Sequence, residues 1–197
     1  ALFIITEWSS FLKDPMSFIT GNGFVVYGGI LGGALTMYFY CKIKKVKFLD
    51  YYDLMVPSVA LAQGFGRIGC FLAGCCYGKE TNSPLGIVFH NSHFTPNDVR
   101  LYPTQIMMSG GDFIIAGILL WYARKDRVKG KTGTLYLILY SIGRFIIEFF
   151  RNDNRGSVGL LSTSQFIGIF ALVFSLLLYF VYFPWLSKKH TEKIEAE

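Results

Sequence analysis

Residues 162–185 read STSQFIGIFALVFSLLLYFVYFPW and include no charged residue. A helix of about 20 such residues crosses a hydrocarbon core of about 30 Å, so this stretch predicts a membrane span. Four other stretches are long and apolar enough for the same role, at 22–41, 54–74, 104–123 and 133–150. The predicted fold class is all-α, a polytopic helical integral membrane protein with about five transmembrane spans.

The composition of the 197-residue chain agrees with this fold class. The chain is 52% hydrophobic and 17% aromatic but only 16% charged, whereas soluble proteins average about 25% charged residues. The aromatic content also excludes a disordered chain. Because the segments between the spans are too short for a soluble domain, we interpret residues 1–197 as a single membrane domain.

The placement of lysine and arginine predicts the orientation of the chain. Two connections and the tail hold twelve of the nineteen cationic residues: Lys42, Lys44, Lys45, Lys47, Arg124, Lys125, Arg127, Lys129, Lys131, Lys188, Lys189 and Lys193. By the positive-inside bias these segments, including the tail 186–197, are cytoplasmic, and the loop 78–103 faces outward. Since the basic residues cluster beside spans, the net charge of +6 does not indicate a nucleic-acid partner.

The amino-terminal sequence leads to a prediction about the extent of the chain. Five spans and a cytoplasmic tail place residue 1 outside, yet the sequence begins at Ala1 with neither an initiator methionine nor a cationic signal. We therefore expect a truncated chain that has lost an even number of spans. Residues 1–6 would then be the remnant of such a span or an interfacial segment.

Four ionisable residues fall inside the predicted spans: Arg67, Asp112, Arg144 and Glu148. Placing an ionisable side chain inside the bilayer costs several kcal/mol unless the side chain is paired or hydrated. We therefore interpret each of these residues as a candidate functional residue. Tyr140, Arg144 and Glu148 recur at every fourth residue and share one helical face. Arg144 and Glu148 form either a pair that only sets helix packing or, together with Arg67, an anion site. Asp112 is either the counter-ion of Arg67, which we favour, or a substitute carboxylate.

Glycines gather in two stretches, YGGILGG at 27–33 and GFGRIGCFLAGCCYG at 64–78. Their small-xxx-small spacing lets helices approach closely in lipid. In the second stretch, so many glycines around Arg67 also weaken a helix and free backbone N–H groups. Such groups beside a guanidinium suit a phosphate, because the guanidinium offers a planar fork of donors.

Of the four cysteines, Cys41 is expected to be structural, whereas Cys70, Cys75 and Cys76 cluster near the outer end of the second span. The commonest role for such small residues is packing at a glycine-rich bend. A redox or acyl-accepting role and a zinc site are the alternatives. Because a fourth ligand of obvious type is lacking, we expect no metal site and no cofactor.

Several motifs together resemble the phosphatidylglycerol–prolipoprotein diacylglyceryl transferase family of bacteria. They are YGGILGG at 27–33, GRIGCFLAGCCYG at 66–78, YPTQ at 102–105, YSIGRFIIEFFRNDNRG at 140–156 and LSTSQ at 161–165. The resemblance covers about residues 22–170 and implies a multi-pass enzyme of the bacterial inner membrane with a cytoplasmic C-terminus. Its implied reaction moves the diacylglyceryl group of phosphatidylglycerol onto the lipobox cysteine thiol of a prolipoprotein and releases glycerol phosphate.

The resemblance also implies site residues. Arg67 and Arg144 match family arginines, and Tyr27 stands where a histidine is common, so these three are the implied catalytic residues. The implied substrate-binding residues are Gly28, Gly29, Gly66, Gly69, Cys70, Gly78, Tyr140 and Glu148. Four further departures indicate a divergent, cysteine-containing branch: Cys70 and Ala73 replace asparagines, Cys75 replaces a glutamate and Tyr102 replaces a histidine.

Two other functions stay open at this point. A membrane thiol oxidoreductase built on Cys70, Cys75 and Cys76 predicts a quinone or thioredoxin-like partner. A non-catalytic relative or transporter predicts binding of an anionic lipid through Arg67 and Arg144 without transfer to a peptide.

Overall fold

A computed structural model describes residues 26–125, 128–152, 157–158 and 161–185. The chain forms two compact units, Ala1–Phe48 and Leu49–Glu197. The predicted amino-terminal remnant at 1–6 and the tail 186–197 lie outside the described residues. In the first unit, α4 spans Val26–Ile43 and so contains most of the span predicted at 22–41, and Cys41 near its end is buried.

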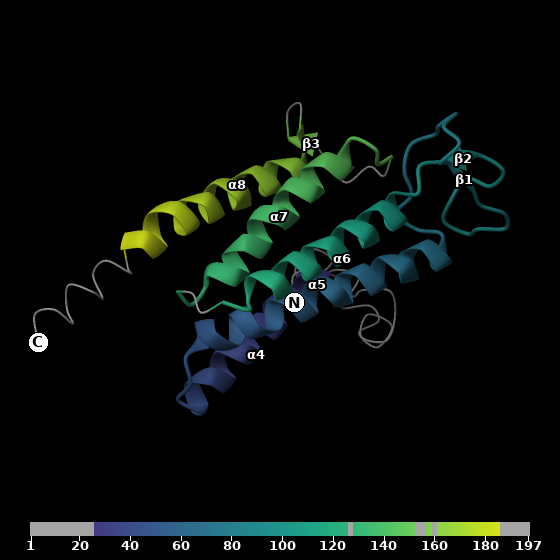
Figure 1. Ribbon diagram of the computed structural model, residues 1–197. Coiled ribbons are helices and arrows are strands. Elements are labelled where there is room, and N and C mark those ends of the chain that lie inside the picture. Colours follow the sequence, from purple (N-terminus) through teal and green to yellow (C-terminus); the bar gives the residue numbers. More distant parts are fainter. Residues whose placement is uncertain (1–25, 126–127, 153–156, 159–160, 186–197) are drawn as a thin grey trace, which may run out of the picture. The chain divides into compact units, whose positions relative to one another are not determined.

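The remaining helices follow in the order of the predicted spans (Figure 1). Helix α5 spans Phe48–Ala73, α6 spans Thr104–Tyr122, and α7 spans Lys131–Glu148. Helix α8, Thr163–Leu177, continues into the π-helical turn η1, Leu178–Tyr182. The prediction of helices in these places is confirmed, although α5 begins at Phe48 and not at residue 54.

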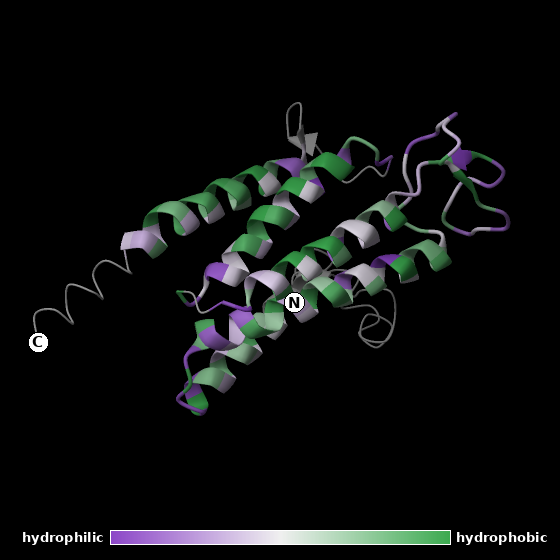
Figure 2. Cartoon of the chain, viewed as in Figure 1, coloured by the Kyte–Doolittle hydropathy of each residue, from purple (hydrophilic) through white to green (hydrophobic). Residues whose placement is uncertain are grey.

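Three of the described helices are long and apolar enough to cross a membrane: Phe48–Ala73, Thr104–Tyr122 and Ser164–Trp185. Helix α8 is hydrophobic along most of its length (Figure 2), and Phe170 and Phe174 are 63% and 60% exposed. An exposed apolar surface of this extent fits lipid and not water. The chain is therefore a helical membrane protein, while the number of five spans stays a prediction.

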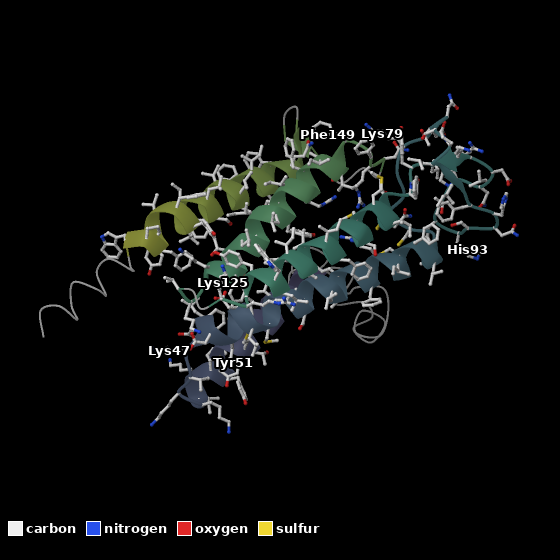
Figure 3. All side chains as sticks on the ribbon, in the orientation of Figure 1. Lys47, Tyr51, Lys79, His93, Lys125 and Phe149 are labelled. Atoms are coloured by element: carbon white, nitrogen blue, oxygen red, sulfur yellow. The ribbon has the colours of Figure 1, made fainter. Side chains whose placement is uncertain are left out.

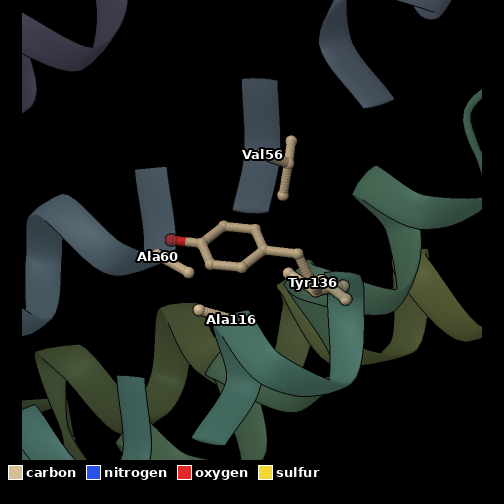
Figure 4. Packing of buried hydrophobic residues seen from close by; sticks show 5 residues of the cluster. Val56, Ala60, Ala116 and Tyr136 are labelled. Carbon is tan, nitrogen blue, oxygen red and sulfur yellow. The ribbon is translucent and has the colours of Figure 1, made fainter. Parts of the chain in front are cut away.

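Helix α7 lies against both α6 and α8 in the second unit (Figure 1). Its Tyr136 is buried among Val56 and Ala60 of α5 and Ala116 of α6 (Figure 4). The Tyr136 hydroxyl donates a hydrogen bond to Gln63 Oε1, so the polar tip of a buried ring has a partner. This core joins α5, α6 and α7.

The beginning of α7 is held by a carboxylate of α5. Gly130 N donates to Asp53 Oδ2 at 2.6 Å, and Gly133 N donates to Asp53 Oδ1 at 2.8 Å. The first N–H groups of a helix lack partners within it, and a negative charge there also complements the helix dipole. Asp53 therefore anchors one end of α7 through its backbone.

The connections contain two short antiparallel ribbons that the all-α prediction did not include. Strand β1, Ile87–Val88, pairs with β2, Arg100–Leu101, and β3, Ser157–Val158, pairs with β4, Leu161–Ser162. These strands lie between helices, where the backbone polar groups need partners that no helix supplies. The correction concerns the connections only.

Candidate functional site

An ion pair lies at the last turns of α7. Arg144 Nη1 is 2.8 Å from Glu148 Oε2, and the two side chains are only 12% and 9% exposed. Arg144 Nη2 also donates to Ser164 Oγ of α8 at 3.1 Å. We call Arg144, Glu148 and Ser164 the charged cluster; its pairing agrees with the shared face predicted for Arg144 and Glu148.

Ser164 reaches Arg144 because of the way α8 begins. Ser162 is the N-cap: its Oγ accepts from Gln165 N, while Gln165 Oε1 accepts from Ser162 N, both at 3.1 Å. This capping box starts the helix within the LSTSQ motif and places Ser164 in its first turn. The sequence prediction did not include Ser164 in the site, although the serine and glutamine spacing of a capping box was visible in the motif.

Tyr140 lies one turn before Arg144 on the same helix, as predicted. Its ring stacks on that of Tyr136, with centroids 5.6 Å apart and an angle of 24° between the planes. Tyr136 belongs to the core, so the stack connects the helical face of the charged cluster to this core. A direct substrate contact by Tyr140 stays a prediction.

Arg67 lies on α5, one turn after Gly64. At Gly64 the helices α5 and α6 touch: Ser109 Oγ donates to Gly64 O at 2.9 Å, and a Cβ added to Gly64 would be 2.6 Å from the Phe113 ring. Asp112 of α6 is only 5% exposed, and its Oδ2 has no hydrogen-bond partner among the described atoms. The favoured role of Asp112 as the counter-ion of Arg67 stays a prediction.

Arg151, just beyond α7, is buried within the protein and is 5% exposed. Its Nη1 lies 3.6 Å from Met108 Sδ of α6. The chain turns back after α7, and Arg151 pairs with Gly78 in an isolated β-bridge. The return of the backbone brings a third guanidinium into the protein.

Two contacts show which part of α6 lies along α7. Tyr136 packs with Ala116, and Arg151 contacts Met108, so α7 runs along the part of α6 between these two residues. Asp112 belongs to that part of α6. The convergence of Arg67 and Arg144 on a single ligand stays a prediction.

The glycines around Arg67 do not free backbone N–H groups. Helix α5 continues through them to Ala73, which contradicts the weakened helix that the sequence analysis expected. A Cβ added at Gly66 or Gly69 would meet nothing within 4 Å among the described residues. The backbone of this stretch is occupied by its own helix, so a phosphate there would have to bind to side chains.

Gly78 has a packing role that explains its residue type. A Cβ at this position would be 2.6 Å from Tyr102 O and 2.7 Å from Phe150 O. Gly78 N donates to Tyr102 O at 3.1 Å, and Lys79 N donates to Phe150 O at 2.8 Å. Gly78 thus lies where three backbone segments meet, whereas its predicted part in substrate binding is untested.

The YPTQ motif holds the turn before Gly78. Thr104 Oγ1 donates to Cys76 O at 3.0 Å, and Gln105 Nε2 donates to Cys75 O at 2.8 Å. We call residues 74–79 the anchored turn, because backbone groups of this turn are hydrogen-bonded to other segments of the chain. Thr104 and Gln105 are further residues that the sequence prediction did not assign a role.

The three clustered cysteines belong to the same region. Cys70 lies in the last turn of α5, Cys75 and Cys76 lie in the anchored turn, and their sulfur atoms are all within 4.8 Å of one another. Burial, followed by the neighbouring Cys76 and Cys70 thiols, raises the pKa of Cys75 to about 12. At neutral pH the Cys75 thiol is therefore protonated and a poor nucleophile in the free protein.

Tyr27, Gly28 and Gly29 lie in α4, as predicted from the YGGILGG motif. Helix α4 belongs to the first unit, and the charged cluster belongs to the second. The predicted participation of these three residues in the site is therefore untested.

Apolar helices around a buried arginine–glutamate pair define a class: helical membrane proteins with an ionisable site among their spans. The sequence profile of the family described as "Prolipoprotein diacylglyceryl transferase" matches residues 3–181. The chain belongs to this family, which confirms the resemblance inferred from the motifs.

Three relatives are similar over most of the chain. The Phosphatidylglycerol--prolipoprotein diacylglyceryl transferase 2 of Clostridium perfringens is 58% identical over 181 residues, 90% of this chain and 70% of that protein. The Phosphatidylglycerol--prolipoprotein diacylglyceryl transferase of Clostridium tetani is 52% identical over 179 residues, 90% of this chain and 72% of that protein. The protein of the same name from Finegoldia magna is 37% identical over 186 residues, 92% and 71% of the two chains.

Proposed function

We propose that this chain transfers the diacylglyceryl group of phosphatidylglycerol to the lipobox cysteine thiol of prolipoproteins. The observation that carries the proposal is the 58% identity, over 90% of the chain, to a protein named for this activity. The reaction makes the chain a transferase of lipoprotein biogenesis. The thiol oxidoreductase and the non-catalytic lipid binder have no comparable support.

The reaction sets clear demands on the site. The sulfur of the prolipoprotein cysteine forms a bond to the glycerol carbon, the bond between that carbon and the phosphate oxygen breaks, and glycerol phosphate leaves. The electron pair of the broken bond stays on the phosphate oxygen, and the thiol proton is lost to the phosphate or to solvent. Negative charge on the phosphate therefore grows in the transition state.

Arg144 is the group we assign to this charge. A guanidinium in a partly buried site stabilises a developing phosphate charge through two parallel hydrogen bonds. Glu148 orients Arg144 along the helix, and Ser164 supports it from α8. Arg67 is the second phosphate-binding arginine in this proposal, because it matches a family arginine and follows Gly64, where α5 touches α6.

The remaining predicted residues have supporting parts in the proposal. Tyr27 hydrogen-bonds the incoming thiol or the phosphate, Tyr140 positions the face of α7, and Gly28 and Gly29 allow close approach of the lipid head group. Deprotonation of the incoming thiol requires no strong general base, because cationic groups near a thiol favour the thiolate.

The topology is also part of the proposal. We propose one membrane domain of five spans, comprising α4, α5, α6, α7 and α8, in the bacterial inner membrane. The C-terminal tail is cytoplasmic and the loop 78–103 faces outward. The cationic connections support this orientation through the positive-inside bias.

The test is to incubate the purified protein in detergent with phosphatidylglycerol and a synthetic lipobox peptide. The molecular mass of the peptide is then measured. We expect the peptide to gain the mass of one diacylglyceryl group. Phosphatidylethanolamine in place of phosphatidylglycerol, and a peptide with serine for cysteine, are the matched controls. A peptide that stays unmodified in the presence of lipid that the protein binds would support the non-catalytic alternative.

A further inference from the structure

Three thiols meet at the end of α5 because of how this helix terminates. Gly74 has a φ of 71°, and its N–H donates to Phe71 O, while Cys75 N donates to Cys70 O, both at 3.0 Å. These two bonds define a Schellman motif, in which the residue after the glycine lies against the last turn of the helix. Cys70 and Cys75 are therefore neighbours.

The third thiol is added by the next residue. Cys76 has a φ of 61°, a left-handed conformation that only a few per cent of residues other than glycine adopt. Thr104 and Gln105 hold the carbonyl groups of Cys76 and Cys75 from the first turn of α6. The backbone that presents the thiols is thus held from two helices before any ligand arrives.

A buried acceptor lies at the same turn. Gln105 is 1% exposed, and while its Nε2 donates to Cys75 O, its Oε1 has no hydrogen-bond partner among the described atoms. A buried polar atom without a partner costs about 1–3 kcal/mol. The same side chain is bonded to the backbone of Cys75, and a water on an ion held by the thiols is a donor of the kind that this oxygen lacks.

We propose that Cys70, Cys75 and Cys76 form a binding site for a thiophilic divalent metal ion, Zn²⁺, with a water or another external ligand in the fourth position. Zinc–sulfur bonds of about 2.3 Å in a tetrahedron place sulfur atoms about 3.8 Å apart. The three sulfur atoms already lie within 4.8 Å of one another, so a small contraction completes the site.

Binding of the ion to the three thiols is balanced in protons and electrons. Each thiol that binds the metal loses its proton to solvent, and no electron is transferred. Arg67, one turn before Cys70 on α5, offsets part of the negative charge of three thiolates around one divalent ion.

The experiment uses the protein in detergent, purified without a histidine tag and reduced with a phosphine. Zinc alone is added, the excess is removed by gel filtration, and the metal per chain is measured by mass spectrometry. We expect one zinc ion per chain, and with cadmium in its place an ultraviolet thiolate-to-metal charge-transfer band. Both signals should be lost in Cys75→Ser and kept in Cys41→Ser, since Cys41 is the lone buried cysteine of α4.

A second measurement distinguishes loss of the site from loss of the fold. Circular dichroism should show the same helix content in both variants, and zinc should raise the Tm of the wild type and of Cys41→Ser but not of Cys75→Ser. Zinc binding that survives in a folded Cys75→Ser, or absence of the charge-transfer band in the wild type, would overturn the proposal. So would a mass lower by two hydrogens in the protein as isolated, before the phosphine is added, because two of the thiols would then form a disulfide.

Discussion

The charged cluster and the anchored turn are both polar regions of the second unit, but they are held in different ways. Arg144, Glu148 and Ser164 contact one another through side chains, across α7 and α8. The anchored turn is held through its backbone by Tyr102, Thr104, Gln105 and Phe150. Side-chain contacts can exchange for contacts with a ligand, whereas backbone bonds are needed to keep the helices in place. We therefore expect chemistry from the first region and stability from the second.

The largest effect is expected for Arg144→Lys in the charged cluster. Lysine keeps the charge but loses the planar fork that matches a phosphate. Removal of one such donor typically raises a barrier by about 2.7–4 kcal/mol, so transfer to a lipobox peptide should fall by roughly 10²- to 10³-fold. The mass gain of the peptide measures the loss. An unchanged Tm is the control, and full activity of this variant would remove the phosphate role of Arg144.

Gly78→Ala, in the anchored turn, should lower the stability of the protein. The added methyl group would lie within van der Waals distance of Tyr102 O and Phe150 O, neither of which can move without breaking a backbone hydrogen bond. Overpacking of this kind costs about 1–3 kcal/mol of stability. Thermal unfolding in detergent should show a lower Tm, with Gly66→Ala, where space is open, as the matched control. Equal Tm values for the two variants would contradict the contrast between the regions.

Ser164→Ala should have a smaller effect on the charged cluster. The variant removes the hydrogen bond from Arg144 Nη2 while the ion pair with Glu148 remains. A loss of about 1.4 kcal/mol corresponds to roughly tenfold in rate. The initial rate of peptide modification measures it, and Ser164→Thr, which keeps the hydroxyl, should recover most of the activity. A Thr variant as slow as the Ala variant would indicate that the hydroxyl has no role.

The smallest effect concerns the reactivity of Cys75 in the anchored turn. Because burial disfavours the charged thiolate, the raised pKa means that the reactive form increases only as the pH approaches about 12. In metal-free protein, the rate of Cys75 alkylation by iodoacetamide should still rise between pH 8 and pH 10, where a free thiol of pKa about 8.5 levels off. Peptide mapping at each pH measures the rate. A plateau near pH 9 would show that the thiol is solvated.

Much of the site was predictable residue by residue. The apolar stretches predicted the helices because hydrophobic length is a local property, and the spacing of Arg144 and Glu148 predicted their pairing because residues four apart share a helical face. Gly78 was singled out, but its reason was not visible, since it depends on Tyr102 and Phe150, 24 and 72 positions away. The burial of Arg151 was not visible in the sequence either, because it depends on the return of the chain after α7.

Hydrophobic length and motif order were enough to establish a helical membrane protein of the diacylglyceryl transferase family, because both are properties of the chain in one dimension. The partners of the charged and sulfur-bearing side chains needed the folded molecule. Ser164 meets Arg144 only when a capping box starts α8 beside α7, and three thiols meet only when a glycine in the left-handed conformation closes α5. Such contacts depend on antiparallel packing and on single backbone angles, which hydrophobic patterns do not encode.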